Sequence, residues 1–130
     1  MKPYRILITG SRDWDDVTAI GAAIEQAVID AGPRPVLVVH GACPSGADWQ
    51  ADHYARWMRG KGVAIDVEPH PANWRPDGTF DRSAGFRRNA EMVKAGADVC
   101  LAFIRNSSRG ASHTAALAEQ AGIPTRRWTS

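Results

Sequence analysis

Residues 4–10 of the chain read YRILITG, a short apolar run that ends in a glycine. A continuous apolar run of this length is typical of a strand that is buried on both faces of a parallel sheet. Asp13, Asp15 and Asp16 follow as candidate helix caps, and apolar side chains recur at helical spacing over residues 20–28. This stretch therefore predicts a strand that leads into a helix.

The same alternation continues to the end of the chain. Apolar runs predict further strands at residues 36–39, 63–67, 99–103 and 123–128, and helical patterns cover residues 47–58, 84–95 and 113–120. Parallel strands need a crossover connection, which is usually a helix and is right-handed. We therefore expect an α/β fold, a single Rossmann-like domain over residues 1–130. About five parallel strands should form a doubly wound sheet in the order 3-2-1-4-5, with helices on both faces.

One segment breaks the pattern. Residues 69–83 contain Pro69, Pro71, Pro76 and Gly78, and they hold Trp74, which we expect to be exposed. Long irregular connections inside a compact domain are usually functional. The segment is therefore predicted to be a functional loop with little regular structure.

Composition excludes several classes of protein. The chain has 130 residues, 44% of them hydrophobic and 23% charged, so a disordered tail and a disulfide-dense mini-protein are excluded. No apolar run has the length of a membrane span, and residues 1–10 do not resemble a secretion signal. Cys43 and Cys100 show no paired spacing, which favours a reducing cytoplasm, and no metal site or cofactor is expected.

The predicted strand order locates a binding crevice. In doubly wound sheets, ligands bind outside the carboxyl ends of the strands where the strand order reverses. Here that point lies between the first and fourth strands, and the loops at residues 10–14, 41–48 and 105–113 should line it. These segments are rich in Gly, Ser and Arg, which suit an anion at a helix N-terminus.

Each loop supplies candidates for ligand binding. Gly41 and Gly46 have the spacing of a phosphate loop, but Ala47 and Asp48 stand where a P-loop NTPase needs Lys and Ser or Thr. Asp48 is expected either to accept a hydrogen bond from a ribose hydroxyl or to cap its helix. The candidate ligand-binding residues are Gly10, Ser11, Arg12, Gly41, Gly46, Asp48, Arg88, Asn89, Ser108, Arg109 and Gly110.

Two helical patterns bear on partners. Arg87 and Arg88 point about 100° apart on a helix, so one can face the crevice while the other faces solvent. Trp49, His53 and Trp57 form an i, i+4, i+8 stripe beside the core positions of their helix. The stripe predicts either a homodimer through this helix or a wide core face.

Four ordered motifs carry a family resemblance. They are residues 6–14 (ILITGSRDW), 40–48 (HGACPSGAD), 84–92 (AGFRRN and Met92) and 108–110 (SRG). With these motifs the chain, from about Tyr4 to Trp128, resembles the YspA-like branch of the SLOG superfamily. Relatives of this branch include the Lonely Guy phosphoribohydrolases, the DNA-processing protein A fold and domains that sense NAD derivatives.

The resemblance implies a Rossmann-like fold, often dimeric, with a nucleotide-type ligand at the glycine-rich loops. The sequence departs from the family pattern at Phe86, where proline is common, and at Ala111, where threonine is common. The catalytic glutamate of the Lonely Guy enzymes falls on His113 or Ala116, depending on the alignment, and neither residue is acidic. The hydrolase reaction is therefore not carried over directly.

Three functions are compatible with these observations. The favoured one is binding of a nucleotide or NAD-derived small molecule by a sensor or sequestering protein. The alternative is an N-glycosidic phosphoribohydrolase acting on a nucleoside monophosphate, for which Glu91, Glu119 or Asp48 would supply the carboxylate. A further alternative is a nucleic-acid-binding accessory that uses the arginines and Trp74, although a net charge of +2 argues against nucleic acid as a partner.

Overall fold

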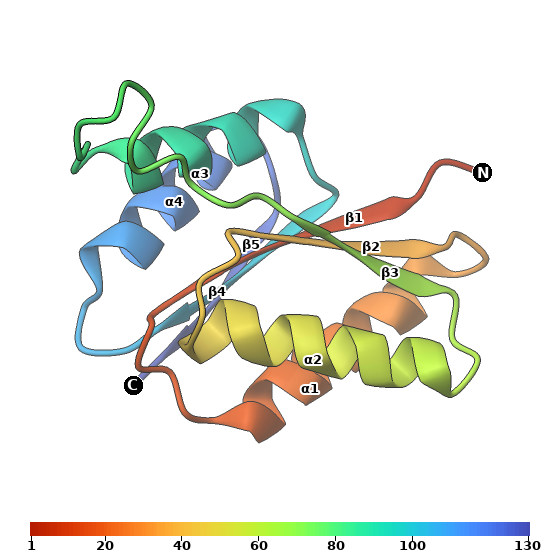
Figure 1. Cartoon of the computed structure of the whole chain (residues 1–130). Helices are drawn as coiled ribbons and strands as arrows, with labels where there is room; N and C mark the ends of the chain where they lie inside the picture. Colours follow the sequence, from red (N-terminus) through yellow and green to blue (C-terminus); the bar gives the residue numbers. More distant parts are fainter.

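The computed structural model describes residues 1–130 as alternating strands and helices (Figure 1). The strands are β1 (Tyr4–Gly10), β2 (Val36–His40), β3 (Ile65–Pro69), β4 (Val99–Ile104) and β5 (Thr125–Thr129). The helices are α1 (Val17–Ala31), α2 (Gly46–Gly60), α3 (Ala84–Ala95) and α4 (Arg109–Gln120). None of these helices combines the length and apolar character that a membrane crossing requires.

All strands belong to one parallel sheet in the order β3-β2-β1-β4-β5. β1 lies at the centre, where Leu7 pairs with Val39 of β2 and Ile8 pairs with Leu101 of β4. The helices α1 and α2 cover one face, and α3 and α4 cover the other (Figure 1). The predicted α/β class, strand order and Rossmann-like arrangement are therefore confirmed.

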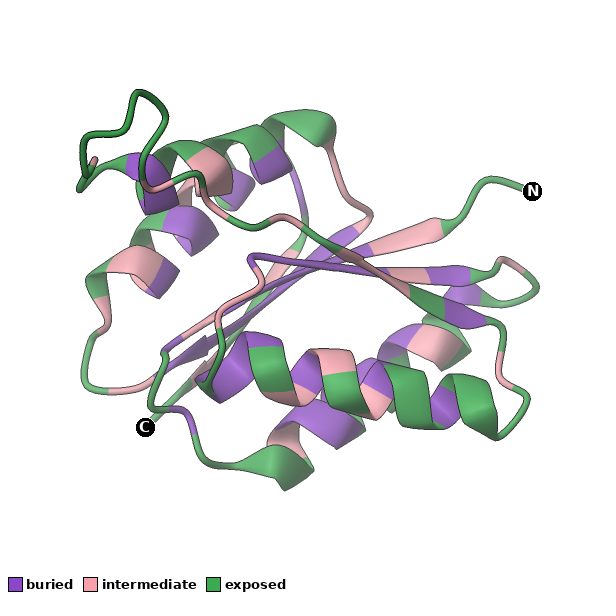
Figure 2. Cartoon of the chain, in the orientation of Figure 1, coloured by how far each residue is buried: buried purple, intermediate pink, exposed green.

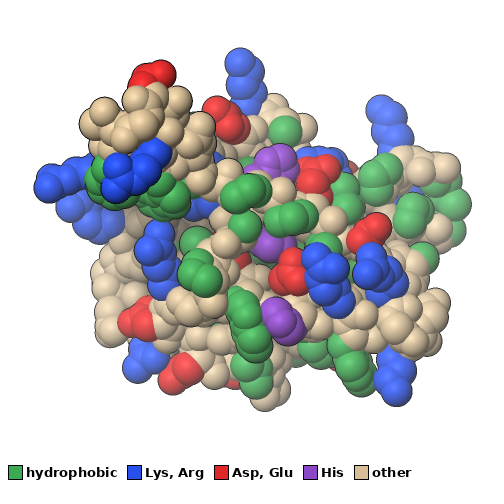
Figure 3. All heavy atoms as spheres, viewed as in Figure 1, with side chains coloured by type: hydrophobic (Ala, Val, Ile, Leu, Met, Phe, Trp, Pro, Cys, Tyr) green, Lys and Arg blue, Asp and Glu red, His purple; other side chains and the backbone are tan.

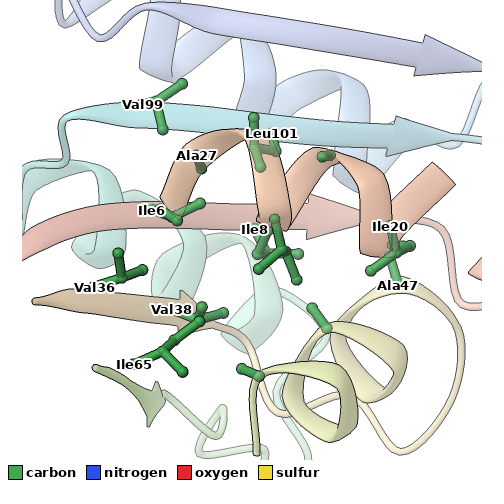
Figure 4. Packing of buried hydrophobic residues seen from close by; sticks show 14 of the residues in the cluster. Ile6, Ile8, Ile20, Ala27, Val36, Val38, Ala47, Ile65, Val99 and Leu101 are labelled. Carbon is green, nitrogen blue, oxygen red and sulfur yellow. The ribbon is translucent and has the colours of Figure 1, made fainter. Parts of the chain in front are cut away.

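The alternation of side chains along β1 divides the core between the two faces. Ile6 and Ile8 pack with residues of α1 and α2 in the larger hydrophobic cluster (Figure 4). Leu7 packs on the opposite face with Met92 and Val93 of α3. In Figure 2 the strands are largely buried, while each helix turns its outer face to solvent. The central strands are thus packed on both faces, and the loops at the carboxyl edge of the sheet continue from them.

Some predicted boundaries are wrong. The last helix begins at Arg109 rather than His113, because its first turn is rich in polar residues and glycine, and Ala111 is its one buried apolar residue. The third strand lies at Ile65–Pro69 rather than 63–67, and the last at Thr125–Thr129 rather than 123–128, because pairing with β2 and β4 defines them. Residues 70–83 form no helix or strand, as predicted for the loop.

Candidate functional site

The main cavity of the molecule opens at the carboxyl ends of the central strands and has a volume of about 320 Å³. Its floor is the end of β1, at Ile8, Thr9 and Gly10. The loops after β1, β2 and β4 contribute walls, as the topological argument predicts. One side of α3 and the loop 70–83 complete the lining.

The cavity brings most of the candidate ligand-binding residues together. Its lining includes Gly10, Ser11, Arg12, Gly41, Asp48, Arg88, Asn89, Ser108 and Gly110. Gly46 and Arg109 are absent from the lining. The candidates that share the cavity come from four separate segments of the chain, so the fold itself assembles the site.

The β1–α1 loop is held tightly against its neighbours. A Cβ on Gly10 would lie 2.3 Å from the Cβ of Ala47 in α2, so only glycine fits there. Ser11 is buried, and its Oγ accepts a 2.8 Å hydrogen bond from the backbone N–H of Arg105. The Ser11 hydroxyl therefore joins the β1 and β4 loops while its residue lines the cavity.

Gly46 does not line the cavity but packs against the backbone of the β1–α1 loop. Its φ is +72°, and a Cβ there would lie 2.2 Å from the backbone oxygen of Ser11. Ala47, the next residue, donates its N–H to the same Ser11 oxygen at 3.2 Å. The role of Gly46 is thus to let α2 begin directly against the β1 loop.

Asp48 organises the β2–α2 loop. The buried carboxylate accepts hydrogen bonds at its Oδ2 from the N–H groups of Gly41 at 3.1 Å and Cys43 at 3.4 Å. Asp48 does not cap its own helix, because both donors belong to the preceding loop and the N-cap residue of α2 is Ser45. Burial raises the pKa of Asp48 above its ordinary value, against the opposing influence of His40, Cys43 and Arg88.

A second pair anchors the same loop at its start. His40 is buried, its Nε2 lies 2.7 Å from Oδ2 of Asp52, and its Nδ1 accepts from the Ala42 N–H at 3.0 Å. The acceptor role of Nδ1 assigns the proton to Nε2, which donates to Asp52. Both ring nitrogens of His40 therefore have hydrogen-bond partners. The pKa of the Cys43 thiol is raised, mainly by burial and also by the negative charge of Asp48. A Cys43 nucleophile with His40 as its base is incompatible with this arrangement.

The two arginines of α3 separate as the helical geometry predicts. Arg88 lines the cavity and donates through Nη1 to the backbone oxygens of Gly41 and His70, and through Nε to Oδ1 of Asn89. Arg87 is exposed and forms an ion pair with Asp81. That hydrogen-bonded pair, with Ser83, lowers the pKa of Asp81 to about 2 and fastens the loop to α3.

The N-terminus of α4 points its unpaired backbone groups at the cavity. Ser108 is the N-cap residue, but its side chain makes no capping hydrogen bond. Asn106 and Ser107, just before it, both have positive φ values, 52° and 53°, which are costly for residues other than glycine. Ser108 and Gly110 line the cavity, so the positive end of the helix dipole faces it.

Three arginines at the cavity lack an acidic partner. Arg12, Arg82 and Arg88 all line it, and none forms an ion pair with a carboxylate. In contrast, most arginines elsewhere in the molecule are paired. Figure 3 shows basic side chains around the lobe that carries the loop 70–83. Guanidinium groups without acidic partners beside an uncapped helix N-terminus are chemically suited to an anion.

Several lining residues were not among the candidates. Arg82, Gly85, Phe86 and Met92 come from the end of the loop and from α3. Trp74 also lines the cavity and is half-buried rather than exposed, because its ring packs 3.1 Å from the Cβ position of Gly85. The motif at residues 84–92 was the available signal, but only tertiary packing shows which side of α3 faces the sheet edge.

Comparison with known proteins agrees with this geometry. The chain is 45% identical over 120 residues to the Gene 61 protein of Mycobacterium phage D29, covering 92% of each. No solved structure matches the chain. The family model for the YspA, cpYpsA-related SLOG family matches residues 4–76, which include β1, the β2–α2 loop, Asp48 and Trp74. This chain belongs to the YspA, cpYpsA-related SLOG family.

Proposed function

We propose that the cavity binds a nucleotide or NAD-derived small molecule through its phosphate, as a sensor or sequestering protein does. Membership of the SLOG family suggests a nucleotide-related ligand. The observation that carries the proposal is the convergence of Arg12, Arg82 and Arg88 with the N-terminus of α4. Phosphate is the anion that suits both kinds of donor.

The remaining lining residues suit the organic part of a nucleotide. Trp74 and Phe86 line the cavity and offer flat aromatic surfaces for a base. Gly110 has open space at its Cβ position, so a ligand can approach the backbone there. Asn89 offers its side-chain amide N–H groups, because its oxygen already accepts from Arg88.

A hydrolase is the second candidate, and Asp48 favours it. Of the three carboxylates considered for that chemistry, only Asp48 lines the cavity, since Glu91 is exposed outside the lining and Glu119 pairs with Arg127. A carboxyl whose pKa burial raises can act as a general acid. Against this role, Asp48 already holds the N–H groups of its own loop.

One experiment separates the two functions. The purified protein is incubated with nucleoside monophosphates, NAD and ADP-ribose, and both fractions after ultrafiltration are read by mass spectrometry. We expect an intact compound to be retained with the protein. Release of a free base together with ribose phosphate would establish the hydrolase instead, and neither retention nor release of any compound would contradict both functions.

The site is tested by removing single charges. Arg82→Ala is the cleanest change, because Arg82 forms no ion pair, and Arg88→Ala removes the central guanidinium. A hydrogen bond to a charged group contributes about 1.5–3 kcal/mol, so each variant should bind the retained compound roughly ten- to 150-fold more weakly by calorimetry. Lys94→Ala, on the same helix but outside the cavity, is the matched control and should bind normally. Equal affinities in all three variants would place the ligand elsewhere.

A further inference from the structure

A second chamber adjoins the main cavity. It has a volume of about 240 Å³ and lies between the loop after β2 and the segment that leaves β3. Its own walls, not shared with the main cavity, are Ala42, Pro44, Pro71 and Ala72. These small, apolar side chains carry no charge, so the chamber suits a flat, uncharged ring rather than another free phosphate.

The two chambers share a wall that contains charge. Arg12, Arg88 and Trp74 line both, together with Gly41 and Cys43. The guanidinium of Arg12 lies over the Trp74 ring, 5.9 Å from its centroid, and Arg88 donates to the backbone oxygens of Gly41 and His70. Arg88 is thus held by hydrogen bonds where the two chambers meet, while the guanidinium of the exposed Arg12 makes only its contact with Trp74.

The fixed position of Arg88 depends on the backbone beneath it. A Cβ on Gly41 would lie 2.7 Å from the Arg88 guanidinium, so glycine is required for the side chain to cross the loop there. Pro44 and Pro71, on either side of the second chamber, have restricted backbones. The second chamber is therefore lined in part by restricted backbone, with Arg12 and Arg88 in its wall.

We propose that the ligand of this protein has two ends: a phosphate link at Arg12 and Arg88 and a ring-bearing group in each chamber. The class is that of dinucleotides joined through phosphate. This inference rests on the proposed function, because it assigns the anion to the same arginines. The main cavity alone lies at the lower limit of the roughly 300–1,000 Å³ typical of ligand sites, whereas both chambers together fall well inside that range.

The test compares probes with one and two rings at equal phosphate number. ADP carries two phosphates and one base, and diadenosine diphosphate carries two phosphates and two bases. We expect diadenosine diphosphate to bind roughly tenfold or more tightly by calorimetry, which is the size of effect that stacking one further base produces. Equal affinity for the two probes would overturn the two-ended ligand but leave the anion site intact, whereas no binding of either would count against the proposed function.

A substitution that fills the second chamber locates the effect. Ala72→Phe places a ring where the second base is proposed to lie, so it should reduce the affinity for diadenosine diphosphate to that for ADP and leave ADP binding unchanged. Ala22→Phe, at an exposed position on α1, is the matched control and should change neither affinity. Ala72→Leu makes the same test with a smaller side chain, should the phenylalanine disturb the loop. Full affinity for diadenosine diphosphate in a folded Ala72 variant would overturn the assignment of the second chamber.

Discussion

At the scale of single residues, Asp48 shows how the site combines support with chemistry. Its Oδ2 accepts hydrogen bonds from the loop N–H groups of Gly41 and Cys43, of which the first is buried and the second partly buried. Asp48→Ala leaves these donors unpaired, and we expect it to lower the free energy of unfolding by about 1–3 kcal/mol. Asp48→Asn keeps an oxygen acceptor and should preserve the fold. Urea unfolding followed by tryptophan fluorescence measures both changes.

The same residue predicts a dependence on pH. Burial raises the pKa of Asp48 in the folded protein, so the ionised form is disfavoured there relative to the unfolded chain. Below the pKa that Asp48 has in the unfolded chain, the carboxyl is protonated in both states and does not lower the free energy of unfolding. As pH rises through the pKa of the folded protein, ionisation of the buried carboxyl lowers the free energy of unfolding. The stability of Asp48→Asn relative to the natural protein should therefore increase between pH 4 and pH 7, and a difference that stays constant would contradict the raised pKa.

At the scale of elements, the start of α2 is set by Gly46. Gly46→Ala meets both a positive φ and the backbone oxygen of Ser11, so we expect a loss of at least about 1–3 kcal/mol in the free energy of unfolding. Gly60, at the other end of the same helix, has open space around its Cβ position. Gly60→Ala should therefore be neutral or stabilise by up to about 1 kcal/mol. Equal effects in the two variants, measured by urea unfolding, would refute the role of Gly46.

The elements also show how far the sequence predicts this protein. Strands β1, β2 and β4 are apolar runs between two layers of helices, and for such runs the pattern alone gives the approximate position. The strand order instead follows from the doubly wound arrangement that alternating strands and helices predict. In the first turn of α4, Ala111 stands among Arg109, Gly110 and Ser112, a composition that is also typical of a loop, so the sequence predicts a start four residues too late. The contributions of Arg82 and Phe86 to the site depend on how α3 docks against the sheet edge, which no local pattern encodes.

At the scale of the whole molecule, α2 presents an apolar outer surface. Trp49 and Trp57 are 47% and 56% exposed, and Val17 at the start of α1 is 59% exposed beside them. The three residues, with His53 stacked on Trp49, line a shallow groove of about 260 Å³ on the side opposite α3 and α4. Exposed apolar groups gathered in this way are typical of contact surfaces.

The spacing of the tryptophans suits a twofold partner. Trp49 and Trp57 are about 12 Å apart along the helix, with His53 midway between them. A twofold axis near His53 would therefore place Trp49 of one copy against Trp57 of the other, the self-complementary pattern of an isologous dimer. We accordingly expect a homodimer through α2 in solution.

Light scattering coupled to size-exclusion chromatography tests this expectation at micromolar concentration. Trp57→Glu places a carboxylate in the proposed interface, where it would be desolvated without a partner, so the variant should elute as a monomer. Ile29→Glu changes an equally apolar and more exposed residue on α1, outside the groove, and should leave the dimer intact. A natural protein that is monomeric, or dissociation caused equally by both variants, would show that the tryptophans of α2 do not join two copies of the chain.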